Sequence, residues 1–251
     1  MALVDNCTHY WKMDEASGNS ADSVGSITLT ATNITRTTGL INNCAVYSGN
    51  YAQAYSADGI LKSNNAWSIS CWFYITAQPT AEASIQNIFY VRNNGYANAI
   101  SLDYRRTSAD VYKFDLNNIG SDSVSTQTET LNTWHHYVIV FDTSNFNFYR
   151  DGSYVFNKAK AGSQSVNAFT IGNFENSYGR PLVGRADECG LWTRALSTGE
   201  ITSLYNSGAG LAYPFNTGPT NLKTYNTNAK ANIKTINTNA IANVKTLNTN
   251  A

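Results

Sequence analysis

The feature that most constrains the fold is a series of short runs in which apolar and polar residues alternate. Across residues 10–211 these runs read WSISCWFYI, NAISLDYRR, VYKFDLNNI, HHYVIVFD, FNFYRDGSYVF and NAFTIGNF, and clusters of Gly, Asn, Asp and Ser separate them. Strand-length runs with a period of two, bounded by turn residues, are typical of sandwiches and jelly rolls. The sequence therefore predicts an all-β fold.

One turn within this region is specified by its own residues. In YRDGSYV, Asp151 and Gly152 accept the positive φ of a two-residue hairpin turn. We therefore expect residues 148–150 and 154–156 to pair as antiparallel strands.

A single helix is expected near the end of this region, in LSTGEITSLYNSG. Ser197 can cap its start, and Glu200 follows three residues later as in a capping box. Gly208 can close its C-terminus, because glycine adopts the left-handed conformation at low cost.

Composition and charge limit the kinds of molecule that this chain can be expected to bind. Charged residues make up only 14% of the chain and give a formal net charge of zero, so no extended field attracts nucleic acid. The start, MALVDNCTHYWKMDEASG, lacks a secretory signal or a membrane anchor. We expect synthesis in a cytoplasm, no membrane association, and an external location reached through a particle or a non-standard export route.

The four cysteines form no CxxC pair, which argues against a zinc site or a redox motif. Cys71 and Cys189 stand in apolar runs, where a thiol packs as a small hydrophobe. We predict buried free thiols, with a disulfide between Cys7 and Cys44 as the alternative.

Longer segments occur in an order that resembles the laminin-G-like, concanavalin A-like jelly-roll family over residues 8–211. They are HYWKMDEASGNSADSVGS, GLINNCAVYSGNYAQAYS, WSISCWFYI, NTWHHYVIVFD, NFNFYRDGSYV, FTIGNF and GRADECGLWTRALSTGEITSLYNSG. The last segment is the most specific, since it resembles the family's final core strand, its W-x-R-A-L-S turn and the following helix. The resemblance implies a jelly-roll sandwich of two antiparallel sheets with one short C-terminal helix.

The chain is expected to divide into a jelly roll over residues 1–213, a linker over 214–221 and a tail over 222–251. Pro214, Gly218 and Pro219 mark the linker, and an eleven-residue repeat begins beyond it. Ordering a residue costs about 1–2 kcal/mol, whereas a buried aliphatic side chain returns about 1.5–3 kcal/mol. The tail therefore needs a partner. Its predicted assembly residues are Leu222, Tyr225, Ile233, Ile236, Ile241, Val244 and Leu247.

Two ordered forms of the tail remain open. Its period fits a helix with about 3.67 residues per turn, but the abundant Asn and Thr favour short strands joined by NTNA turns. The repeat also resembles tails of laminin-G-like proteins encoded by bacteriophages. We expect the tail to bind copies of itself or other virion proteins.

A glycosidase site is not expected. Glycosidases on this fold place two or three acids on one strand so that both reach the scissile bond. Here Asp14 with Glu15 and Asp187 with Glu188 are adjacent pairs, and adjacent strand residues point to opposite faces. Nor does a companion at triad or metal-ligand spacing accompany His9, His135 or His136. We predict a protein without enzymatic activity.

Calcium is the one cofactor for which the resemblance provides candidates. Calcium takes six to eight oxygen ligands from carboxylates and carbonyls. Asp14, Asp22 and Asp187 resemble the ion site of some family members. The alternative is that these carboxylates cap turns and satisfy backbone donors.

A glycan could stack on exposed aromatic rings, but no residue is singled out, because tyrosine is common on sheet faces. The tyrosines in or near loop-like stretches are Tyr51, Tyr55, Tyr90, Tyr96, Tyr104 and Tyr178, with Arg92, Arg105, Arg106 and Arg180 nearby.

Together these expectations favour a structural protein on the surface of a bacteriophage virion, a head decoration or fibre subunit. The lectin-like jelly roll would be displayed outward and the tail would mediate assembly. The alternative is a carbohydrate-binding adhesion module on a cell surface or an extracellular filament.

Removing the tail tests its assembly role. Truncation after Pro214 should give a folded monomer, whereas the full chain should form oligomers. Ile233→Asp with Val244→Asp should mimic the truncation, because unpaired carboxylates are costly to bury. Light scattering measures the masses, and equal monomer masses for full-length and truncated protein would contradict self-assembly through the tail.

Overall fold

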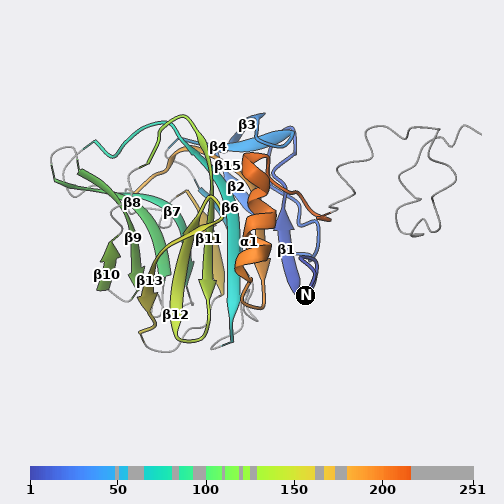
Figure 1. Cartoon of the computed structure of the whole chain (residues 1–251). Coiled ribbons are helices and arrows are strands. Elements are labelled where there is room, and N and C mark those ends of the chain that lie inside the picture. Colours follow the sequence, from blue (N-terminus) through green and yellow to red (C-terminus); the bar gives the residue numbers. More distant parts are fainter. Residues whose placement is uncertain are drawn as a thin grey trace, which may run out of the picture. The chain divides into compact units, whose positions relative to one another are not determined.

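The computed structural model describes residues 1–48, 51–55, 65–80, 85–92, 100–108, 111–118, 121–124, 129–161, 167–172 and 180–215. The chain separates into two compact units, Met1–Pro214 and Phe215–Ala251. The tail residues predicted to mediate assembly lie outside the described residues. The first unit is a two-sheet sandwich (Figure 1).

Sheet I has eight strands in the order β13-β12-β11-β6-β15-β4-β3, with β1 also paired to β15. Its strands are β1 (Cys7–Trp11), β3 (Thr35–Thr38), β4 (Asn43–Ser48), β6 (Trp67–Ile75), β11 (Trp134–Phe141), β12 (Asn145–Arg150), β13 (Ser153–Ala159) and β15 (Val183–Trp192).

Sheet II has seven strands in the order β10-β9-β8-β7-β14-β5-β2. Its strands are β2 (Thr30–Thr32), β5 (Tyr51–Tyr55), β7 (Ile85–Arg92), β8 (Ile100–Ser108), β9 (Val111–Asn118), β10 (Ser121–Val124) and β14 (Ala168–Ile171). All described pairings in both sheets are antiparallel, so the predicted jelly-roll sandwich is confirmed.

The predicted hairpin between β12 and β13 is also confirmed. Arg150 pairs with Ser153 across a two-residue loop. Asp151 and Gly152 have φ values of 51° and 77°, as a type I′ turn requires. The sequence therefore fixes this turn locally.

Aromatic side chains from the two inner faces fill the space between the sheets. Phe73 of β6 lies 6.2 Å from Phe89 of β7, and Phe114 of β9 lies 5.2 Å from Tyr137 of β11, between ring centroids. Such tilted and edge-on contacts add to the free energy gained by burying the rings. The alternation seen in the sequence thus becomes one continuous apolar core.

The central strand β15 contains a β-bulge. Its register against β6 shifts between Asp187 and Gly190, and Glu188 has a φ of 50°. Ala186 and Cys189 both pack in the core, so Asp187 and Glu188 between them both leave the core face. Adjacent strand residues therefore do not point to opposite faces here, and the geometric reason given above against an acid pair fails at this position.

Helix α1 (Thr198–Tyr205) covers part of the outer face of sheet I, the face turned away from sheet II (Figure 1). The Tyr205 ring stacks on Trp72 of β6 at 5.8 Å between centroids. The predicted capping box of Ser197 and Glu200 is confirmed. The helix ends at Asn206 rather than Gly208, because Asn206 takes the left-handed conformation at the C-cap, which asparagine tolerates.

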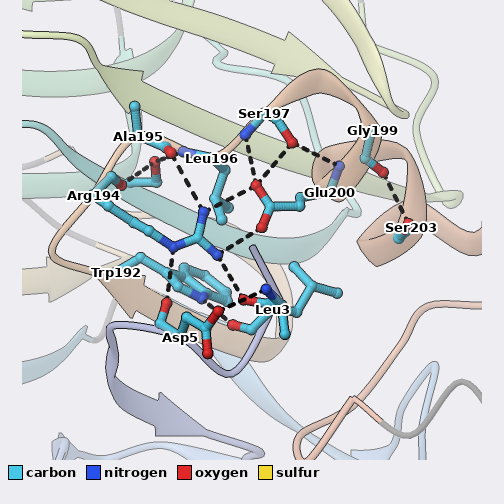
Figure 2. A network of polar contacts seen from close by, with 12 residues as sticks. Leu3, Asp5, Trp192, Arg194, Ala195, Leu196, Ser197, Gly199, Glu200 and Ser203 are labelled. Atoms are coloured by element: carbon cyan, nitrogen blue, oxygen red, sulfur yellow. Dashed lines mark hydrogen bonds and ion pairs between the residues drawn. The ribbon is translucent and has the colours of Figure 1, made fainter.

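Arg194 joins the start of this helix to the N-terminal segment (Figure 2). Its guanidinium donates hydrogen bonds to both carboxylate oxygens of Glu200, at 2.9 and 2.7 Å. It also donates to the carbonyl oxygens of Ala2 and Asp5, at 2.9 and 2.8 Å. One arginine therefore ties together the last strand, the helix and the N-terminus.

The four cysteines are buried free thiols, as predicted. Burial raises the pKa of Cys7 to about 12 and that of Cys44 to about 11. These thiols are therefore protonated and unreactive at neutral pH.

Glu200→Gln tests the Arg194 network. Hydrogen bonds from Arg194 and Ser197 lower the pKa of Glu200 to about 2 despite its partial burial. A carboxylate with a depressed folded-state pKa stabilises the fold above its unfolded-state pKa, and this contribution is lost as pH falls toward the folded-state value. We expect the variant to unfold more easily by about 1–3 kcal/mol at pH 7.

The difference between the variant and the unmodified protein should shrink as the pH is lowered from about 5 to about 2. Urea titrations at several pH values provide the measurement. Ser203→Ala, on the exposed side of the same helix, should change stability by less than about 0.5 kcal/mol. A Glu200→Gln difference that does not vary with pH would contradict this interpretation.

Candidate functional site

The bulge of β15 brings Asp187 and Glu188 toward Asp14 on the outer face of sheet I. Asp187 Oδ2 accepts hydrogen bonds from the backbone N–H groups of Leu40 and Ile41, at 2.9 and 3.1 Å. These belong to the loop of residues 39–42 between β3 and β4. Asp187 and Glu188 are 0% and 2% exposed. The loop is therefore held over a buried pair of acids.

Asp14 holds the same loop from the other side. Its carboxylate accepts from Asn42 Nδ2 and from the Asn43 backbone N–H, both at 3.2 Å. Its carbonyl oxygen accepts from Asn43 Nδ2 at 3.1 Å. We name Asp14, Asp187 and Glu188 the acid cluster.

Burial dominates the electrostatics of the acid cluster. It raises the pKa of Asp187 to about 8, opposed by the N–H groups of Ile41 and Leu40, while the charges of Glu188 and Asp14 raise it further. Burial likewise raises the pKa of Glu188 to about 7, and the neighbouring Tyr10 hydroxyl acts in the opposite direction. Two buried carboxyl groups this close to one another favour their protonated forms unless a cation compensates their charge.

The third predicted calcium residue, Asp22, forms hydrogen bonds with a different set of residues. Its carboxylate lies 2.6 Å from His9 Nδ1. It also accepts backbone N–H bonds from Tyr10, Val24, Gly25 and Ile27. Partial burial opposes these bonds, but they lower the pKa of Asp22 to about 2. Asp22 therefore closes a turn, as the alternative interpretation expected, and its oxygens already have donors.

Of the three predicted calcium residues, Asp14 and Asp187 lie at the same loop, whereas Asp22 does not. Asp187 Oδ1 is buried and accepts no hydrogen bond from a described residue. Among the described residues, however, no three His, Cys, Asp or Glu side chains converge as a metal-binding group. Calcium held here would need carbonyl or amide oxygens beside the carboxylates, a mixture that it accepts. Calcium binding stays a prediction, with Asp14 and Asp187 as its candidate ligands.

A Ser–His pair that the sequence did not suggest lies beneath α1. Ser70 Oγ and His136 Nε2 are 2.7 Å apart, and both residues are buried. Burial lowers the pKa of His136 to about 3, and its Nδ1 has no partner among the described residues. A triad needs an acid at this nitrogen to orient the imidazole. The other two histidines each contact an aspartate, His9 with Asp22 and His135 with Asp151.

The outer face of sheet II contains a buried polar cluster. Asp103 of β8 accepts from Asn87 Nδ2 of β7 at 2.6 Å and from Ser101 Oγ at 3.1 Å. These bonds tie β7 to β8. Tyr90 and Tyr104, expected near loops, are fully buried and present no ring for stacking. The side chains of Tyr51, Tyr55, Tyr96 and Tyr178 lie outside the described part of the structure.

Aromatic side chains that remain partly exposed lie on the outer face of sheet I. Trp134 of β11, Tyr74 of β6 and Arg185 of β15 stand opposite one another in the strand register. The Trp134 and Tyr74 ring centroids are 5.4 Å apart, and Arg185 Cζ lies 4.9 Å from the Tyr74 centroid. All three residues are partly exposed. We name them the aromatic row.

On the same face of these strands, two positions from the aromatic row, Trp72, His136 and Asp187 are covered by helix α1 and the 39–42 loop. The aromatic row itself is not covered by either. Tyr205 stacks on Trp72 and on His136, at 5.8 and 6.4 Å. The 39–42 loop is bonded to Asp187 at the matching position of β15. One row is therefore buried, and its neighbour is left partly open to solvent.

Comparison with known proteins assigns the chain to a family. A family model described as the concanavalin A-like lectin/glucanases superfamily matches residues 47–202. The chain belongs to the concanavalin A-like lectin/glucanases superfamily. The resemblance read from the sequence is thus confirmed at this level, while the likeness of the tail to phage proteins stays a prediction. No curated protein matches the chain in sequence.

Solved structures support the superfamily fold. Domain 4 of AbnA, a GH43 extracellular arabinanase from Geobacillus stearothermophilus, solved in complex with arabinotriose, superposes with a TM-score of 0.61 at 20% identity. The superposition covers 78% of this chain and 97% of that domain. Identity at this level shows the fold alone.

Two larger proteins contain the same fold. Trypanosoma rangeli sialidase gives a TM-score of 0.65 at 16% identity, over 82% of this chain and 33% of the sialidase. The binding domain of Paraclostridial Mosquitocidal Protein 1 gives 0.64 at 16% identity, over 82% and 53%. This superfamily member therefore spans about a third of the one and half of the other.

The aromatic row was not identified from the sequence, although part of its signal was there. Alternation in WSISCWFYI places Tyr74 on the face opposite the core residues Phe73 and Ile75. The pairing of Tyr74 with Trp134 and Arg185 depends on strand register, which links segments about 60 and 110 residues away in the chain.

The calcium prediction is tested by thermal unfolding of the full chain with calcium and with a chelator. Calcium that binds only the folded acid cluster should raise Tm. At a calcium concentration 100 times Kd, the free energy of unfolding should increase by about 2.7 kcal/mol. Asp187→Asn should abolish the response. Asp22→Asn should lower Tm but leave the calcium response intact. Equal Tm values with calcium and chelator would show that the prediction is wrong.

Proposed function

We propose that this superfamily member is a non-catalytic carbohydrate-binding module whose binding surface is the aromatic row. The observation that carries the proposal is the partly exposed contact of Trp134, Tyr74 and Arg185 on a sheet face that α1 covers in part. Sugars bind proteins by stacking apolar ring faces on aromatic side chains, while polar groups fix their hydroxyls. A tryptophan, a tyrosine and an arginine in one row supply both kinds of contact.

Rigidity supports the same surface. Each residue of the row is anchored in a central strand of sheet I, and each strand has a partner on both sides. Side chains held on strands lose little conformational freedom when a ligand binds, and this favours affinity.

The absence of catalysis is part of the proposal. A glycosidase must bring two carboxyl groups to the scissile bond. Asp187 and Glu188, although adjacent on one face, are both buried, and Asp187 lies beneath the 39–42 loop. The Ser70–His136 pair is buried and its histidine is a weak base. These placements support binding rather than turnover.

The virion-surface role predicted from the sequence remains a proposal with separate support. It rests on the repeat of residues 222–251, which lies beyond the described residues. A carbohydrate-binding jelly roll is compatible with display on a phage particle, a cell surface or an extracellular filament. Among the described residues, no helix has the length and apolar character to span a bilayer.

A glycan array probed with the full chain tests the proposal, beside hydrolysis assays on β-glucan, laminarin and sialosides. We expect binding of at least one glycan class and no release of product. Trp134→Ala should weaken binding by about 10- to 30-fold, the effect of removing a central aromatic contact.

Tyr154→Ala provides the matched control, because Tyr154 is 52% exposed but lies on edge strand β13, outside the row. It should bind as the unmodified protein does. Two results would refute the proposal: no glycan binding at all, or product release that stops on changing Asp14 or Glu188.

A further inference from the structure

We propose that Arg185 makes the aromatic row selective for carboxylate-bearing sugars over their uncharged counterparts. The inference rests on the proposed function and adds the ligand's chemical class. Its basis is the Arg185 guanidinium, which packs on a ring and forms no ion pair with any described acid.

The other arginines with described charge partners differ from Arg185 in this respect. Arg36 pairs with Glu15 and Arg150 with Glu129, and Arg194 pairs with Glu200. Arg180 lies 4.0 Å from Asp103. Within the described part of the chain, no carboxylate forms an ion pair with Arg185.

The hydrogen bonding of Arg185 leaves most of its donors available. In its one described hydrogen bond, Nη1 donates to the Thr38 carbonyl oxygen at a long 3.5 Å. A guanidinium has five N–H donors in a planar fork that matches a carboxylate. Its position over the Tyr74 ring restrains the guanidinium, so less freedom is lost when a ligand binds.

The strand positions beside Arg185 add no competing charge. Its cross-strand neighbours are Tyr74 of β6 and Val46 of β4, and Val46 pairs in turn with Thr35 of β3. Asp187, the nearest acid along β15, is buried under the 39–42 loop. The partly exposed surface therefore joins two aromatic rings to a single positive charge, which suits a sugar ring that carries one carboxylate.

Matched ligand pairs separate the charge from the sugar. Isothermal titration of the full chain would compare trigalacturonate with its methyl ester, and 3′-sialyllactose with lactose. The first pair tests uronic acids and the second tests sialic acids. We expect the acidic member of at least one pair to bind about 10- to 100-fold more tightly, the range for a charge-assisted hydrogen bond.

Arg185→Gln should remove this preference, because the affinity for the acidic ligand should fall about 10- to 100-fold further than the affinity for its uncharged counterpart. Lys158→Gln, which removes one positive charge from edge strand β13, should leave the preference intact. Equal Tm values would show that each variant is folded. If Arg185→Gln does not fold, Arg185→Lys replaces it. The affinity of the unmodified protein is then also measured at rising salt concentration, because only a preference that depends on charge weakens as salt rises.

The outcomes separate this inference from the proposed function. Uncharged and acidic ligands that bind equally, or an Arg185→Gln variant that keeps the preference, would overturn the selectivity while the module still binds glycans. Failure of the unmodified protein to bind any of the four ligands would overturn the inference, and the glycan array would then decide whether the module binds other sugars.

Discussion

The β-bulge at Asp187 and Glu188 is the constraint on which the outer face of sheet I depends. On one edge, β15 pairs with β4 up to Ala186 and with β1 from Cys189, and the bulge lies where the partner changes. Both bulge residues leave the core and turn their carboxyl groups outward. Asp187 then supplies acceptors for two N–H groups of the 39–42 loop. Backbone strain at Glu188 is thus coupled to a docked loop.

This arrangement divides the outer face into a covered part and an open part. Tyr205 at the end of α1 packs on Trp72 and His136, the loop is bonded to Asp187, and burial raises the pKa values of Asp187 and Glu188. The aromatic row, next to them in the same strands, remains partly exposed. Asp187, Glu188 and the Ser–His pair are buried, whereas the aromatic row has two rings and a charge partly exposed at the surface. The same packing is the physical basis of the binding role proposed above.

Much of the fold could be predicted because its signals are local. Asp151 and Gly152 specify their hairpin, and Ser197 with Glu200 specify the start of α1. The candidate site could be predicted only in part. Asp14 and Asp187 do meet at one loop, but Asp22 is held in a turn by His9 and backbone donors. The alternation rule failed at Asp187 and Glu188, because a bulge inserts a residue that no periodic pattern shows.

The sequence by itself determined the all-β class, the tight turn, the helix cap and the superfamily, because each depends on residues close together in the chain or on ordered motifs. Only the tertiary structure decided which side chains share a surface. Trp134, Tyr74 and Arg185 come from three strands that are distant in sequence, and their contact is set by the register of β11, β6 and β15. A shift of one residue in any of these strands would turn its member of the row toward the core.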